Sequence, residues 1–153
     1  MAPGFPDRPA RAKIDDAREL NALACRTYSG FIPVMDAVPA PMLTDLHALV
    51  RDHEVWVIRG DTGLIGSLAL IRQEDHLLIE SIAVDPDHQG GGAGRFLLDF
   101  ARIRAAELGL GVLRLYTNVR MVRNRDWYKR AGFEETGHEQ RGDKHIVHMK
   151  LTL

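Results

Sequence analysis

The sequence contains very little cysteine: among 153 residues there is only one, Cys25. A single cysteine excludes an internal disulfide, and we expect the chain to work in a reducing cytoplasm. The chain also lacks a basic surplus, since 20 Lys and Arg residues stand against 21 Asp and Glu residues. General nucleic-acid binding usually needs such a surplus, so we expect no nucleic-acid partner. No run of 18 apolar residues is present, so we expect no membrane span.

The length and composition indicate a single globular domain. At 153 residues the chain is about one domain long, and its 45% apolar and 27% charged residues are ordinary for a soluble protein. The first nine residues contain no apolar signal core. We therefore expect residues 1–9 to form a flexible tail that precedes one domain spanning residues 10–153.

Hydrophobic periodicity and turn residues predict a mixed α/β domain with a central sheet and flanking helices. Strands are expected at residues 11–14, 55–59, 64–72, 77–84, 112–117, 133–140 and 145–151. Helices are expected from a cap at Asp15 or Asp16 through Tyr28, from Pro41 through Val50, and at residues 93–108 and 123–131, with an irregular segment at 29–41. The three strands between residues 55 and 84 should form an antiparallel meander. The helical crossover that follows makes the 112–117 strand parallel to the 77–84 strand.

The connection after the 77–84 strand is rich in glycine. Residues 89–94 read Gln-Gly-Gly-Gly-Ala-Gly, and a helix opens directly after them. Residues without bulky side chains leave backbone N–H groups free to point at one spot, and the helix N-terminus adds the positive end of its dipole. This combination favours a phosphorylated cofactor. The alternative is a glycine-rich connection without a ligand, although consecutive glycines are costly in backbone entropy.

The glycine spacing excludes two common phosphate-binding motifs. The dinucleotide fingerprint needs glycines at its first, third and sixth places, and from Gly90 the sixth residue is Arg95. The P-loop needs a Gly-Lys-Ser/Thr sequence, which does not follow here. The remaining pattern is Gln-x-x-Gly-x-Gly, at Gln89, Gly92 and Gly94. It resembles the acetyl-CoA pyrophosphate loop of the GNAT superfamily of N-acetyltransferases.

A second motif carries the same resemblance. Asn124, Tyr128 and the run Ala131, Gly132 and Phe133 are similar to the family's Asn-x-x-x-Tyr-x-x-x-Gly-Phe stretch. Together with the order of elements, the two motifs extend the resemblance over almost the whole chain. It implies the GNAT acyl-CoA N-acyltransferase fold and acetyl-CoA as co-substrate. It also implies a hydrogen bond from Asn124 to pantetheine, with a helix N-cap as the alternative role of this residue.

The resemblance further implies where acetyl-CoA is held. The diphosphate would rest on the loop residues Gln89, Gly90, Gly91, Gly92, Ala93, Gly94 and Arg95. Pantetheine would insert between the fourth and fifth strands, and it would pair with the backbone of Ile82, Ala83 and Val84. Many relatives carry a basic residue at the place of Gly91. Arg95 is the candidate to replace that charge.

Two residues are candidates for moving protons. Tyr128 resembles the family's general acid, which protonates the departing thiolate, and tyrosine and thiol pKa values lie within about two units of each other. Glu80 stands in an otherwise apolar strand, where burial should raise its pKa and suit it to a general base. Glu80 could instead anchor a cationic acceptor or face solvent, and Tyr128 could simply pack. The Ile82 N–H would stabilise the developing oxyanion.

We therefore expect an N-acetyltransferase that acetylates a primary amine by direct attack in a ternary complex. The amine belongs to a small molecule or a protein, and Tyr28, Phe31 and Met35 are expected to wall the acceptor site. The alternative is a non-catalytic acyl-CoA-binding sensor or partner module, which would need neither Tyr128 nor Glu80. The seven histidines form no ligand cluster, so no metal site is expected. Dimers are common in the family, and the resemblance allows a homodimer.

Overall fold

The computed structural model describes residues 5–28 and 45–153. The strands are β1 (Ala10–Arg11), β2 (Glu54–Gly60), β3 (Gly63–Arg72), β4 (Leu77–Val84), β5 (Val112–Asn118), β6 (Glu134–Arg141) and β7 (Lys144–Thr152). The α-helices are α1 (Ala17–Tyr28), α3 (Leu46–Asp52), α4 (Ala93–Glu107) and α5 (Val122–Arg130), with short 3-10 turns at Ile14–Asp16 and Pro86–His88. Phe31 and Met35, expected at the acceptor site, lie outside the described residues.

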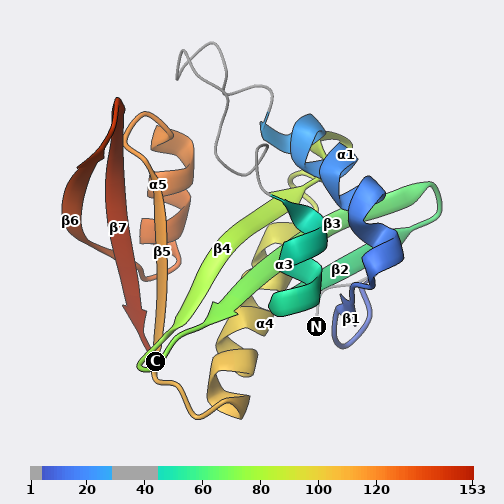
Figure 1. Cartoon of the computed structure of the whole chain (residues 1–153), viewed down its shortest axis with the longest axis horizontal. Coiled ribbons are helices and arrows are strands. Elements are labelled where there is room, and N and C mark those ends of the chain that lie inside the picture. Colours follow the sequence, from blue (N-terminus) through green and yellow to red (C-terminus); the bar gives the residue numbers. More distant parts are fainter. Residues whose placement is uncertain (1–4, 29–44) are drawn as a thin grey trace.

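The described strands form one mixed sheet with the order β1-β2-β3-β4-β5-β7-β6. Every neighbouring pair is antiparallel except β4 with β5, which is parallel as the crossover rule predicted. Helices α1 and α3 lie on one face of the sheet, and α4 lies on the other (Figure 1). The predicted fold class is confirmed. Within the described ranges, none of the helices combines the length and apolarity that a membrane crossing requires.

The largest local differences from the prediction lie near the N-terminal end. The first strand ends at Arg11 instead of residue 14, because the Asp16 carboxylate accepts a hydrogen bond from the Lys13 N–H at 2.8 Å and starts a helical turn there. The second helix is observed from Leu46, with Asp45 as its N-cap. The parts of the prediction that concern residues 29–44 lie outside the described residues.

The two faces of the sheet have separate apolar cores. One core joins α4, through residues such as Leu97, Phe100 and Ala101, to the sheet and to α5. These residues recur at the three- and four-residue spacing that places them on one face of α4. The other core joins α1, through Leu20 and Leu23, to the opposite face of β2, β3 and β4. Strand β4 contributes to both cores and is the middle strand of the seven.

Strand β4 contains a bulge at Glu80. The register pairs Ile79 with Leu70 and Ser81 with Ala69, which leaves Glu80 as an extra residue in the ladder. Before the bulge Ile79 packs in the α4 core, and after it Ile82 packs against that same core. A bulge changes which residues face which side of a sheet. The bulge therefore interrupts the regular alternation of side chains along β4 at Glu80, which lines a cavity beside the strand.

Candidate active site

Strands β4 and β5 separate after a short parallel contact. They pair only at Leu77 with Leu113 and at Leu78 with Arg114. Figure 1 shows β4 leaning away from β5 toward the top of the view. Among the described residues, no other strand covers the edge of β4 that this divergence exposes. The strands are therefore splayed at the place where the resemblance implied that pantetheine inserts.

Along β4, the backbone N–H and C=O groups of successive residues point alternately toward β3 and toward this gap. Asp85 donates its N–H to the Ile65 carbonyl of β3 at 2.7 Å, and successive backbone groups of a strand point to opposite edges. The N–H and C=O groups of Ile82 and Val84 therefore face the gap, whereas those of Ala83 face β3. The predicted backbone pairing with pantetheine is compatible with Ile82 and Val84 but not with Ala83.

Side chains already contact the carbonyl groups on this edge. The Tyr28 hydroxyl donates to the Ile82 carbonyl at 2.6 Å. The Thr27 hydroxyl and the Gln89 amide donate to the Val84 carbonyl at 3.1 and 3.2 Å. Sequence reasoning did not connect Tyr28 with this strand, because a helix-terminal tyrosine gives no signal of its tertiary partner. These contacts hold the edge in place and leave its N–H groups facing the gap.

The glycine-rich loop has the conformation that donors for a phosphate need. Gly90 and Gly92 have φ angles of 86° and 92°, in the left-handed region that favours glycine. Gly92 is the N-cap of α4, and no side chain caps this helix end. Residues 93–95 form the first turn of α4, and their backbone N–H groups have no acceptor within the helix. The loop thus presents a row of donors beside a helix dipole.

The other loop residues have individual surroundings. A Cβ atom at Gly94 would lie 3.3 Å from the Trp127 ring, so this glycine allows α4 and α5 to approach each other. The methyl group of Ala93 is buried in the α4 core. Arg95 forms an ion pair with Asp99 at 3.0 Å. The role of Arg95 in replacing a charge at Gly91 stays a prediction.

A cavity lies in the gap between β4 and β5, and it brings together predicted site residues from two elements, β4 and α5. Glu80, Ile82, Asn124 and Tyr128 all line it. Tyr116 and Lys144 line it as well, and sequence reasoning missed both. Their place follows from strand pairing: Tyr116 of β5 pairs with His148 of β7, and Lys144 begins β7. Loop residues 89–95 do not line the cavity and lie at the start of α4 instead.

Glu80 has the electrostatic surroundings expected of a base. Burial raises the pKa of its carboxyl group, and the Tyr116 hydroxyl, 3.5 Å from Oε1, opposes this only in part. The predicted direction of this pKa shift is confirmed. The charges of His53 and Arg141 also act to lower the pKa of Glu80, but burial dominates. The carboxylate can therefore accept a proton at a higher pH than an exposed glutamate.

Tyr128 is a buried residue, with 8% of its surface exposed. Its ring makes edge contacts with Trp127 and Phe133, at centroid distances of 4.9 and 5.5 Å. Burial raises the pKa of its hydroxyl, which keeps the proton in place at working pH. Asn124 lies one turn earlier on the same helix, and the N-cap of α5 is Met121. The alternative role of Asn124 as the helix cap is therefore wrong.

The residues present fit acetyl-CoA. The loop N–H groups suit a diphosphate, the Ile82 and Val84 backbone suits an amide-bearing pantetheine arm, and the cavity between the strands suits its reactive end. Among residues 5–28 and 45–153, no three His, Cys, Asp or Glu side chains are arranged to hold a metal ion.

Comparison with known proteins identifies the family. The model of the acetyltransferase (GNAT) domain matches residues 51–135, more than half of the chain. The chain belongs to the GNAT acetyltransferase family. It is accordingly an acetyl-CoA-dependent acyltransferase that uses an amine as acceptor, and the predicted family, fold, enzyme class and co-substrate are confirmed.

Individual relatives of this GNAT acetyltransferase agree with that assignment. The chain is 28% identical to the peptidyl-lysine N-acetyltransferase YjaB of Escherichia coli K12 over 138 residues, covering 87% of this chain and 86% of YjaB. A GNAT-family protein from Desulfovibrio desulfuricans matches with a TM-score of 0.75 and 21% identity, covering 93% and 96% of the two chains. The PaiA N-acetyltransferase of Thermoplasma acidophilum, solved with coenzyme A, matches with a TM-score of 0.68 and 18% identity over 93% and 96%. The two structures show the shared fold.

Proposed function

We propose that this GNAT acetyltransferase acetylates the side-chain amine of a lysine in a protein or peptide, by direct attack in a ternary complex. The observation that supports direct attack is a single cavity, lined by Glu80, Ile82 and Tyr128, at the divergence of β4 and β5. The peptidyl-lysine activity in the name of YjaB supports the acceptor class.

Each of these residues has a separate task. Acetyl-CoA supplies an activated acyl group and a thiolate leaving group. Glu80 takes the proton of the incoming ammonium, since an alkylamine with a pKa near 10 is almost fully protonated at neutral pH. The N–H of Ile82, which faces the gap, donates to the carbonyl oxygen as negative charge develops there. Asn124 holds the pantetheine arm from α5.

Tyr128 gives a proton to the departing sulfur and regains one from the nitrogen, which loses its second proton as the amide forms. Burial raises the pKa of its hydroxyl, which by itself would make it a weaker acid. The departing thiolate lies in the same apolar surroundings, and burial raises the pKa of a thiol for the same reason. The raised pKa of Tyr128 disfavours the proton transfer and the raised pKa of the thiol favours it. Because these effects offset each other, the transfer remains feasible.

The two substrates would approach from opposite faces of the sheet. Val147 and Met149 of β7 pack in the α4 core, so the alternate residues Ile146 and Lys144 face the side of α1 and α3. Ile146 and Lys144 line the cavity from that side. We therefore place the entrance for the amine on the α1 and α3 side. The diphosphate of acetyl-CoA would lie at the start of α4, on the other side.

The test is a thiol-release assay with acetyl-CoA and three acceptors: a lysine-containing peptide, the same peptide with arginine in place of lysine, and a panel of small amines. Release with the lysine peptide alone supports the proposal. Release with small amines alone contradicts the acceptor class. Binding of acetyl-CoA in calorimetry without release for any amine would favour the alternative, a non-catalytic acyl-CoA-binding module. Light scattering of the same sample tests the predicted homodimer.

A further inference from the structure

The segment that leads into β1 packs along the whole of α4. We call residues 5–11 the N-terminal segment. The Phe5 ring stacks on Phe96 in the first turn of α4, with a centroid distance of 5.2 Å and an interplanar angle of 22°. Three residues later, Arg8 forms two hydrogen bonds with the Glu107 carboxylate at 2.7 and 3.1 Å. Glu107 is the last residue of α4, so the segment is attached to both ends of this helix.

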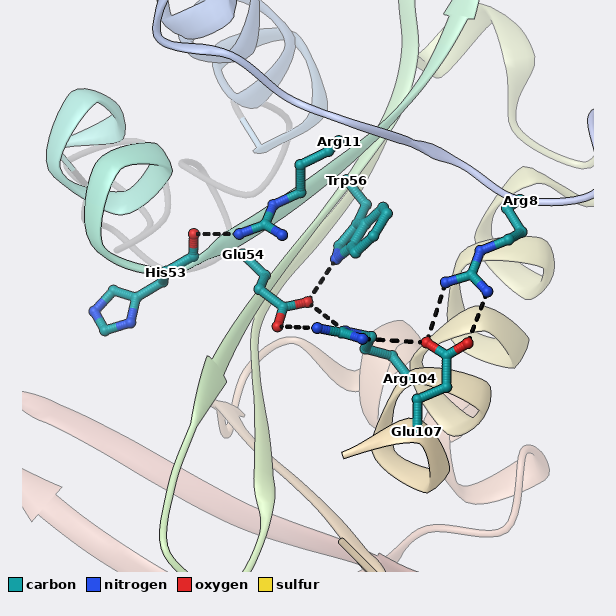
Figure 2. A network of polar contacts seen from close by, with 7 residues as sticks. All are labelled: Arg8, Arg11, His53, Glu54, Trp56, Arg104 and Glu107. Atoms are coloured by element: carbon teal, nitrogen blue, oxygen red, sulfur yellow. Dashed lines mark hydrogen bonds and ion pairs between the residues drawn. The ribbon is translucent and has the colours of Figure 1, made fainter. Parts of the chain in front are cut away.

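The attachment at Glu107 belongs to a larger network (Figure 2). Arg104 donates to Glu107 at 3.2 Å and to both oxygens of Glu54 at 2.7 and 2.9 Å. Trp56 donates its indole N–H to Glu54 at 3.0 Å, and Arg8 also lies over the Phe100 ring, 5.0 Å from its centroid. The network connects the N-terminal segment, β2 and the end of α4. It fixes the position of residue 8 and limits where Phe5 can lie.

The attachment at Phe5 reaches the glycine-rich loop itself. A Cβ atom at Gly92 would lie 3.8 Å from Phe5 Cε2, which is van der Waals distance. Gly92 is the N-cap of α4, with φ at 92°, and it belongs to the Gln-x-x-Gly-x-Gly motif. Glycine has more backbone freedom than any other residue, so a run of glycines needs outside contacts to keep one conformation. Within the described residues, the Phe5 side chain is the nearest atom group to that side of Gly92.

We infer that Phe5 is a positioning residue for acetyl-CoA binding: it holds Gly92 and the first turn of α4 so that the loop N–H groups converge on the diphosphate. This inference rests on the proposed role of the loop. Arg8 contributes indirectly, because its contact with Glu107 keeps Phe5 over the loop. Neither residue touches the reacting atoms, so both should affect binding of the co-substrate and leave the chemical step unchanged.

The test compares Phe5→Ala with Ile103→Ala, which removes a 50% exposed apolar side chain from the same helix away from the loop. Phe5→Ala should weaken coenzyme A binding by about 3- to 10-fold in calorimetry, the cost of ordering one or two loop residues at binding. Its kcat at saturating acetyl-CoA should stay within about twofold of wild type. The coenzyme A affinity of Phe5→Leu should lie between those of Phe5→Ala and wild type. Arg8→Gln should also weaken binding, and Ile103→Ala should match wild type.

Hydrogen exchange of residues 89–96 provides a readout that does not depend on the ligand. Faster exchange in folded Phe5→Ala, together with its weaker coenzyme A binding, supports the inference. Unchanged exchange and unchanged affinity in a folded Phe5→Ala or Phe5→Leu variant would overturn it. If wild-type protein itself fails to bind coenzyme A, the proposed role of the loop fails instead. The exchange experiment would then still show whether Phe5 restrains the loop.

Discussion

Glu54 and Glu80 are both glutamates on central strands, yet their surroundings differ. Glu54 accepts hydrogen bonds from Arg104 and Trp56; burial acts to raise its pKa, but these donors outweigh it and lower the pKa. Among residues 5–28 and 45–153, Glu80 has one hydrogen-bond partner, the Tyr116 hydroxyl at 3.5 Å, and burial raises the pKa of Glu80. Hydrogen-bond donors around a carboxylate stabilise its charged form and so contribute to folding. A buried carboxylate with few donors has a raised pKa and accepts a proton more readily. The network of Figure 2 connects β2 to α4, whereas the cavity is where we propose the chemistry takes place.

The largest expected effect is on turnover when the two glutamates are exchanged for glutamine. Glu80→Gln should lower kcat/KM by about 10²- to 10⁴-fold at neutral pH, because the general base is removed. Glu54→Gln should leave kcat/KM near wild type and instead cost about 1–3 kcal/mol of unfolding free energy, from its charged hydrogen bonds. Steady-state kinetics and urea unfolding of both variants check the comparison. Similar losses of turnover in both would remove the distinction.

The pH profile of the wild-type enzyme sharpens the same point. Glu80 must be deprotonated to act as a base, so activity is lost as pH falls through its pKa in the folded protein. Because burial raises that pKa, the acid limb of kcat/KM should lie above the usual glutamate value of about 4.3. An acid limb at or below that value would contradict a buried base.

The next effect concerns the proton donor. Tyr128→Phe should lower kcat by about 10- to 1000-fold, because it removes the hydroxyl and keeps the ring contacts with Trp127 and Phe133. Coenzyme A affinity should be nearly unchanged in calorimetry. Tyr116→Phe is the matched control, since it also removes one hydroxyl from the cavity but not the proposed acid. Normal turnover of Tyr128→Phe would mean that another group protonates the sulfur.

A smaller effect is expected at the strand edge. Tyr28→Phe removes the donor that contacts the partly buried Ile82 carbonyl at 2.6 Å. Leaving this carbonyl without its donor should cost about 1–3 kcal/mol of unfolding free energy. Urea unfolding at neutral pH measures it. A variant as stable as wild type would show that the contact with Ile82 contributes little.

The smallest expected effect is on the stability of the protein at low pH, through the contacts of Glu107 with Arg8 and Arg104. Contacts with Arg8 and Arg104 lower the pKa of Glu107 to about 2. A carboxylate with a lowered pKa stabilises the fold above its unfolded pKa of about 4.3, and this contribution is lost as pH falls from there toward about 2. Glu107→Gln should therefore flatten the stability curve over that range in thermal unfolding. An identical curve for the variant would show that the ion pair does not matter in solution.

Sequence reasoning succeeded where a function requires local backbone geometry. The glycine loop, the start of α4 and the helix that carries Asn124 and Tyr128 could all be predicted, because their signals lie within a few residues of each other. It did not separate Ala83 from Ile82 and Val84, since which edge of β4 a residue faces depends on the register with β3. It also missed Tyr116, Lys144 and the bulge at Glu80, which exist only once strands distant in sequence are paired.

The sequence by itself determined the family, the order of elements and the co-substrate, because glycine motifs and hydrophobic periods are properties of short segments. Only the tertiary structure decided that β4 and β5 separate, that Tyr28 contacts the edge of β4, and that Phe5 lies against Gly92. These contacts join residues many positions apart. Their formation depends on the packing of whole helices and strands, which no local pattern of residues encodes.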